Sequence, residues 1–383
     1  MELKYCAAPW RGLHINFRGD VKTCCAGDPN MLGDLNHHTI SDIVYGTPLK
    51  EIRQSIRSGR LHPDYCSNCI KAERNGRSER HWHNDVNQDF DVTAATDDYY
   101  DPTIIDVRWN TTCNLSCNYC GEYCSSKWQS IKKGIAIKNG ARPYYQQVCD
   151  FLEQHATDIR EVALVGGEPF LLPENERLLD VIPRDCIVTL ITNTSIELER
   201  NAIFQKIRER NRVGWSMSFD NIDQRFEYVR HGGDWSLLNH NVDLVRDLMT
   251  HQGHWGGIHA VYNVYNCTRL VEFKQWAHDR GLTIMWQTLF QPEYLDPLQH
   301  GEELRRLAGL EAQRLLDTCG DILQDNERDF FTHAVSNLKN TPSRSGHYTE
   351  LFKKHILDNE DIYHPDKKDQ FVQLWPEFEF LVK

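Results

Sequence analysis

Three cysteines stand within eight residues, in the run Cys113-Asn-Leu-Ser-Cys117-Asn-Tyr-Cys120. Gaps of three and then two residues let one turn of backbone direct three thiolates at one point, as an iron–sulfur cluster requires. Three thiolates leave one iron of a four-iron cluster open, and an open iron can chelate a small molecule. Cys124 follows four residues later, and we expect it to pack, because a fourth ligand would close the open iron.

A second group of cysteines lies near the amino terminus. Alternating apolar residues on both sides of Arg18-Gly-Asp20 predict a hairpin that returns its last residues towards Cys6. Four thiolates make a closed site, which suits a structural zinc ion as well as a cluster. A fifth cysteine is either an alternative ligand or a small buried side chain. The four ligands are Cys6, Cys24, Cys66 and Cys69, with Cys25 as the alternative to Cys24.

Six predicted strands position the three-cysteine run at 113–120. Runs such as 187–191 are almost continuously apolar or β-branched, which is typical of parallel strands buried on both faces. Each strand is followed by a helical or loop segment, and this alternation predicts an α/β fold with a barrel-like parallel sheet. The predicted strands are 103–110, 161–165, 187–192, 213–219, 257–264 and 282–288.

Function in such barrels sits at the carboxyl ends of the strands. The first strand ends in the three cysteines and the second in Gly166-Gly167-Glu168-Pro169. Two glycines let backbone approach a ligand closely, and a carboxylate is the natural partner of an ammonium group. Polar residues that end or follow the other strands are Asn193, Ser216, Ser218, Asp220, Asn263 and Gln287, and Asp220 is equally suited to cap the next helix.

Two further segments lie close to these strand ends. Asp106, Arg108 and Asn110 alternate along the first strand, so they share one face just before the cysteine loop. Arg108 there would either contact a ligand or form a salt bridge that steadies the loop. The segment 225–235 follows the fourth strand, and we expect it to face a substrate over the mouth of the barrel.

The three-cysteine run, with the aromatic Tyr119 before its last cysteine and Gly-Gly-Glu-Pro one strand later, resembles the signature of the radical S-adenosylmethionine (radical SAM) enzymes. The resemblance implies a partial (β/α)6 TIM-like barrel. It also implies that Cys113, Cys117 and Cys120 hold a 4Fe–4S cluster whose open iron binds SAM. The residues expected to contact SAM are Tyr119, Gly166, Gly167, Glu168, Pro169, Asn193, Ser216, Ser218, Asp220, Asn263 and Gln287.

The amino-terminal pattern resembles a different part of the same enzymes. A cysteine, Pro-Trp, a strand, Gly-x4-Cys, Leu-Gly-Asp-Leu and Cys-x2-Cys follow one another as in the auxiliary-cluster modules called SPASM and, in a shorter form, twitch. In most relatives the module follows the barrel, and here it precedes it. Because the motif is interpreted together with the signature that follows it in the chain, the resemblance favours a second 4Fe–4S cluster over zinc.

Taken together, the resemblance implies an oxidoreductase-type enzyme that reductively cleaves SAM to methionine and a 5′-deoxyadenosyl radical. The radical would take a hydrogen atom from a peptide or a small polar metabolite, and the auxiliary cluster would accept or relay an electron. A flavodoxin or ferredoxin is the expected donor. One alternative is a radical SAM isomerase or epimerase that uses SAM catalytically, and another is a zinc-stabilised binding protein.

Length and composition set the remaining expectations. The 383 residues suggest a module at 1–80, a linker at 81–102, the barrel at 103–295 and a helical extension at 296–383. A formal charge of −12 makes a nucleic-acid partner unlikely. No run of about 18 apolar residues or secretory signal is present, so we expect a cytoplasmic protein without a membrane partner. Thirteen cysteines in that reducing compartment point to metal or cluster binding, not disulfides.

Overall fold

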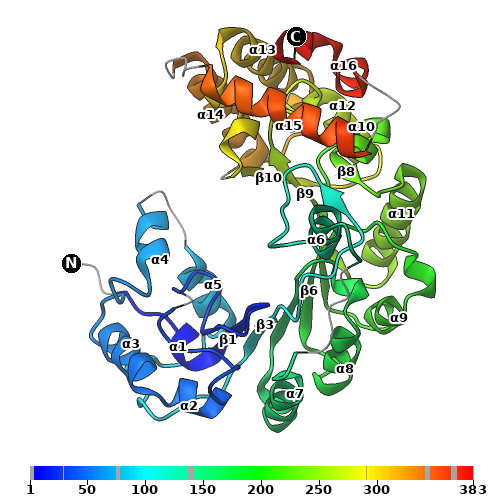
Figure 1. Cartoon of the computed structure of the whole chain (residues 1–383). Helices are drawn as coiled ribbons and strands as arrows, with labels where there is room; N and C mark the ends of the chain where they lie inside the picture. The colour runs from blue at the N-terminus through cyan, green and yellow to red at the C-terminus, as the bar shows by residue number, and fades with distance from the viewer. Residues whose placement is uncertain are drawn as a thin grey trace.

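An eight-stranded sheet runs through the computed structural model, which describes residues 4–28, 30–74, 78–136, 142–289, 291–340, 346–363 and 369–382 (Figure 1). The strand order is β10-β9-β7-β6-β5-β3-β1-β2, and every neighbouring pair is parallel except the β1–β2 hairpin. The strands are β1 (Gly12–Ile15), β2 (Val21–Lys22), β3 (Ile104–Val107), β5 (Glu161–Leu164), β6 (Ile187–Thr192), β7 (Val213–Ser218), β9 (Trp255–Tyr262) and β10 (Ile284–Thr288).

The six predicted strands are β3, β5, β6, β7, β9 and β10, in the predicted order along the chain. The α/β class is therefore confirmed, and so are the small module before the parallel strands and the helical carboxyl-terminal extension. The sheet does not close on itself, because β10 and β2 remain at its edges.

One face of the sheet is covered and the other is open. Along β6, Val188 and Leu190 are buried, whereas Ile191 is 38% exposed. The expectation of strands buried on both faces is thus wrong for β6, because the helices that return the chain cover one side only (Figure 1). These helices include α7 (Tyr145–Gln154), α8 (Pro173–Val181), α9 (Ala202–Arg208), α10 (Asp223–Val229), α11 (Trp235–His251) and α12 (Leu270–His278).

The amino-terminal module extends the sheet. Its strand β1 pairs in parallel with β3, in the register Leu13↔Ile105, so module and barrel share one backbone hydrogen-bond network. The predicted boundary at residue 80 falls inside helix α5. The helices of this part are α1 (Ala8–Arg11), α2 (Ile40–Val44), α3 (Thr47–Arg57), α4 (Ser67–Ala72) and α5 (Glu79–Val86).

The carboxyl-terminal helices pack at the β10 end of the sheet, away from the module (Figure 1). Trp375 is fully buried, its indole N–H donates to the Tyr265 carbonyl at 2.9 Å, and its ring packs edge-on against Tyr228. This segment therefore docks on the barrel. The helices are α13 (Glu302–Thr318), α14 (Asp325–Asn340), α15 (His347–Tyr363), α16 (Gln370–Leu374) and α17 (Glu379–Val382).

Among the described residues, no helix has both the length and the apolar character that crossing a membrane requires.

Replacing Trp375 by alanine should lower the free energy of unfolding by about 3–5 kcal/mol, because a large buried ring and its hydrogen bond are lost. Urea unfolding of the apoprotein measures the change. Phe380, which is 46% exposed, is the matched control and should lose less than about 1 kcal/mol on replacement by alanine. Equal losses for both variants would show that the terminal segment does not dock as described.

Candidate functional site

The three-cysteine loop is attached to a distant part of the chain. After β3 it forms the short strand β4 (Ser116–Cys117), which pairs antiparallel with β8 (Arg230–His231) and places Cys117 opposite Arg230. The indole of Trp128, on α6 (Ser126–Lys133), donates to the Cys117 carbonyl at 2.9 Å. Backbone pairing and this anchor fix the loop at the carboxyl end of β3, where the sequence placed it.

Arg230 brings a positive charge to the loop. It is 7% exposed, and its guanidinium lies 3.9 Å from the Cys117 sulfur, 3.2 Å from the Asp220 carboxylate and 5.3 Å from the centre of the Tyr119 ring. Burial raises the pKa of the Cys117 thiol, and Arg230 opposes that rise. A cation beside the thiols favours the thiolate forms that ligate metal.

The Gly-Gly-Glu-Pro segment packs directly against this loop. A Cβ atom added at Gly167 would lie 2.1 Å from the Thr112 carbonyl oxygen, so only glycine fits. The next backbone N–H, that of Glu168, donates to the same carbonyl at 2.8 Å. Gly166 has a φ of +139°, which glycine alone adopts readily. The two motifs predicted from sequence therefore form one structure.

Glu168 is the most unusual side chain at this junction, because its carboxylate is completely buried. It accepts hydrogen bonds from the Thr192 hydroxyl and the Asn193 backbone N–H, each at 2.8 Å. Burial nevertheless raises its pKa to about 7. Within the described ranges no Lys, Arg or His forms an ion pair with it. A buried carboxylate of this kind fits a ligand that supplies an ammonium group.

The other predicted SAM contacts differ in how close they lie to the three-cysteine loop. Asn193 lies at the loop, where its side-chain N–H₂ is 3.7 Å from the Cys113 sulfur. Ser216 and Ser218 are half-buried on the open face of the sheet, where Ser216 pairs in register with Ile191. Gln287 is on edge strand β10 and is exposed, so the structure leaves it apart from the loop.

Two further predicted contacts form hydrogen bonds within the framework. Asn263 is fully buried, and its side chain closes its own turn through the Val261 carbonyl and the Tyr265 N–H. Asp220 accepts from the Tyr119 hydroxyl, from Arg230 and from the Val261 N–H, and the residue that caps α10 is Ile222. The capping role considered for Asp220 is therefore wrong.

The structure also bears on three neighbouring expectations. Cys124 is exposed, so the expectation that it packs is wrong, and its thiol hydrogen-bonds to that of Cys120. Arg108 takes the salt-bridge role, at 3.1 Å from Asp106. Tyr228, in the segment expected to face a substrate, is buried against Trp375. Arg230 in the same segment reaches the cysteine loop, which sequence reasoning did not foresee.

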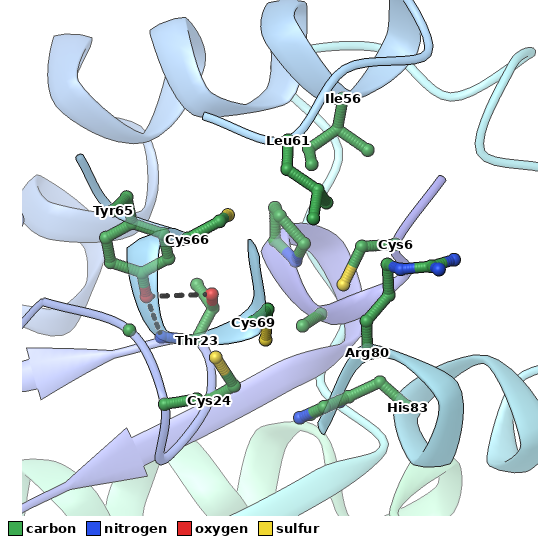
Figure 2. Close-up of a pocket in the computed structure, with 14 residues that line it drawn as sticks. Cys6, Thr23, Cys24, Ile56, Leu61, Tyr65, Cys66, Cys69, Arg80 and His83 are labelled. Carbon is green, nitrogen blue, oxygen red and sulfur yellow. Dashed lines mark hydrogen bonds between the residues drawn. The ribbon is translucent and has the colours of Figure 1, made fainter. Parts of the chain in front are cut away.

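The amino-terminal cysteines line one small cavity (Figure 2). The Tyr65 hydroxyl lies 2.8 Å from the Thr23 backbone N–H and holds the end of the hairpin near α4. Cys25 is exposed and does not line the cavity, so the structure selects Cys24. The cavity also receives Arg80 and His83 from α5. Its four cysteines are Cys6, Cys24, Cys66 and Cys69.

The chemistry of this cavity suits a thiolate-held group. Burial raises the pKa of the Cys66 thiol to about 11, so a positive centre is required to hold the thiolate form. Arg80, anchored to Glu73 at 2.8 Å, adds a positive charge that lowers the pKa of Cys6 against the larger effect of burial. In the part of the chain that the structure describes, no three His, Cys, Asp or Glu side chains stand close enough to hold a single metal ion.

Replacing Arg230 by methionine should cost about 3–5 kcal/mol, because Asp220 would keep a buried charge without its cation. The double variant Asp220→Asn, Arg230→Met should lose less than the sum of the two single losses. Urea unfolding of the four apoproteins completes the cycle. Additive losses would mean that the two side chains do not interact.

Several solved structures show a limited likeness to this chain. They include native anSMEcpe with bound AdoMet (18% identity over 66% of each chain, TM-score 0.41). Streptococcus suis SuiB bound to S-adenosylmethionine matches at 15% identity over 57% of this chain and 48% of its own, with a TM-score of 0.41. The alignments thus span less than two thirds of these two chains. TYW1 with a lysine-pyruvate adduct matches at 15% identity over 56% of this chain and 74% of its own, with a TM-score of 0.35. Likenesses of this size support no statement about the site.

No curated protein matches the chain. Residues 6–70 match the family model SPASM, described as an iron-sulfur cluster-binding domain, and they contain all four cysteines of the cavity. The prediction of a SPASM-type module ahead of the parallel strands is confirmed: this part of the chain is similar to the SPASM iron–sulfur cluster-binding domains.

Proposed function

We propose that the protein is a radical SAM enzyme with an open and a closed 4Fe–4S cluster. The observation that carries the proposal is the buried Glu168 carboxylate, which forms no ion pair with a Lys, Arg or His of the described residues and is held against a loop that presents three cysteines. The first cluster would be held by Cys113, Cys117 and Cys120, and the second by Cys6, Cys24, Cys66 and Cys69.

At the open cluster, the residues of the chain bind and orient SAM. Glu168 receives the amino group of its methionine portion, and Asn193, Ser216 and Ser218 supply polar groups to the carboxylate and ribose. When bound, the cluster and SAM supply a 5′-deoxyadenosyl radical, because one electron breaks the S–C5′ bond and leaves methionine. The open face of β6 and β7, next to this site, is where we place the substrate from which the radical takes hydrogen.

The closed cluster is proposed to accept or relay an electron from the substrate. Arg108 supports this role, because its charge interacts with a cysteine next to each of the two sites. Burial disfavours its charge, but Asp106 and then the thiols of Cys25 and Cys124 raise its pKa overall. Cys25 is next to Cys24 in the chain, and the Cys124 thiol hydrogen-bonds to that of Cys120. One side chain thus interacts with neighbours of both sites, and the pairing of β1 with β3 joins the two sites to one sheet.

The substrate is proposed to be a peptide or a small polar metabolite, and the electron donor a flavodoxin or ferredoxin. Analysis of products separates this proposal from an isomerase that regenerates SAM. Consumption predicts 5′-deoxyadenosine in a one-to-one ratio with product, whereas regeneration predicts far less.

Iron and acid-labile sulfide after anaerobic reconstitution should reach about eight per chain, the content of two four-iron clusters. Replacing Cys113, Cys117 and Cys120 together by alanine should leave about four, and so should replacing the four cavity cysteines. Cys25→Ala is the control and should keep about eight. About four in the wild type, falling to none in the first variant, would assign the amino-terminal site to zinc or to no metal.

Glu168→Gln should weaken SAM binding roughly 10- to 100-fold, because a charge-assisted hydrogen bond to the ammonium group is lost. The raised pKa gives a second signature. As pH falls through about 7, the folded-state carboxyl takes up a proton, so wild-type affinity should decrease below that pH and the glutamine variant should not follow. Anaerobic calorimetry with cluster-loaded protein measures both effects, and iron content checks that the variant remains loaded. Equal affinities and pH profiles would remove Glu168 from the SAM site.

A further inference from the structure

A buried histidine stands in the four-cysteine cavity without a visible partner. His83 is 1% exposed, and in the described part of the chain neither of its ring nitrogens finds a hydrogen-bond partner. Figure 2 shows it reaching from α5 to the cavity that the cysteines line. A polar group buried unpaired costs about 1–3 kcal/mol, so such an arrangement calls for a further partner.

The position of this ring is firmly set by its helix. Asn84 accepts from the Ala7 backbone N–H at 2.9 Å and donates to the Tyr5 carbonyl at 3.1 Å, which ties α5 to the chain on both sides of Cys6. On the other side, a Cβ atom added at Gly12 would lie 2.9 Å from the ring carbon Cε1 of His83. The imidazole is thus clamped between β1 and the cavity.

An imidazole carries at least one N–H donor in either protonation state. The four thiols that line the same cavity already suffice for a closed cluster. A further ligand is not required, and the role left for the imidazole in this position is to donate its N–H to sulfur.

We infer that His83 donates a hydrogen bond to a sulfur of the auxiliary cluster and thereby raises the reduction potential of that cluster. The inference rests on the proposed function, because it requires a cluster in this cavity. Hydrogen bonds to sulfur are an established means by which proteins set cluster potentials. The reduced cluster carries one more negative charge, so an N–H donor stabilises it more than the oxidised form. Arg80, in the same cavity, acts in the same direction. A raised potential suits a cluster that accepts an electron from the substrate.

The test is a redox titration of the full-length, two-cluster protein followed by electron paramagnetic resonance. The auxiliary signal is identified as the one that persists when Cys113, Cys117 and Cys120 are alanine. His83→Phe keeps an aromatic ring but removes the donor. We expect it to retain wild-type iron content, to lower the auxiliary midpoint potential and to leave the other potential unchanged. His83→Gln, whose amide can donate, should shift the potential less.

His254→Phe is the matched control, because this histidine is also buried but bonds to Trp215 and to the Arg210 carbonyl outside the cavity. It should change neither potential. In protein labelled with ¹⁵N-histidine, pulsed resonance should detect a weak nitrogen coupling at the auxiliary cluster that His83→Phe removes.

An unchanged auxiliary potential in His83→Phe, with iron retained, would overturn the inference and leave the two-cluster proposal intact. Loss of the auxiliary iron in both His83 variants would also overturn it, because His83 would then be a ligand or a structural residue. Wild-type protein without an auxiliary cluster would instead contradict the proposed function, and the inference with it.

Discussion

Both cysteine sites contain buried ionisable side chains. Burial disfavours their charged forms, and the protein charges nearby do not offset this cost. At the carboxyl end of β5, Glu168 is fully buried and its pKa is raised to about 7, although it accepts well-formed hydrogen bonds. Beside it the thiol of Cys113 has its pKa raised to about 12, chiefly by burial. Such a free-energy cost of burial persists in a folded protein where a bound ligand offsets it. SAM would supply the ammonium group, and iron would supply the positive centre for the thiolates.

The remaining architecture keeps these groups in place. Gly167 allows the Glu168 segment to meet the cysteine loop at a distance that no side chain would permit. Arg230 reaches the loop through the β4–β8 pair and is fixed by Asp220, which in turn binds the backbone of β9. Pairing of β1 with β3 carries the amino-terminal cavity to the same sheet. The module precedes the barrel in the chain, yet it lies next to the first barrel strand because the sheet joins them.

Much of this could be predicted because it depends on local sequence. The six strands follow from short apolar runs, and the two cysteine groups and Gly-Gly-Glu-Pro follow from spacing. Arg230 was missed because it meets Cys117 across 113 residues of chain, through a two-residue strand pair that no pattern marks. His83 was given no role because its meaning comes only from the cavity that the fold builds around it. The hydrogen bonds by which Asn263 closes a turn could not be predicted, because a polar residue after a strand looks alike in sequence whether it binds a ligand or closes a turn.

The central claim is that only one of two clusters has an iron open to SAM. It is tested most directly by resonance spectra of the reduced, fully loaded protein recorded with and without SAM. The account predicts two signals, of which SAM changes one, the signal that is missing when Cys113, Cys117 and Cys120 are replaced. A spectrum that SAM leaves unchanged, or a change confined to the signal of the amino-terminal site, would contradict it.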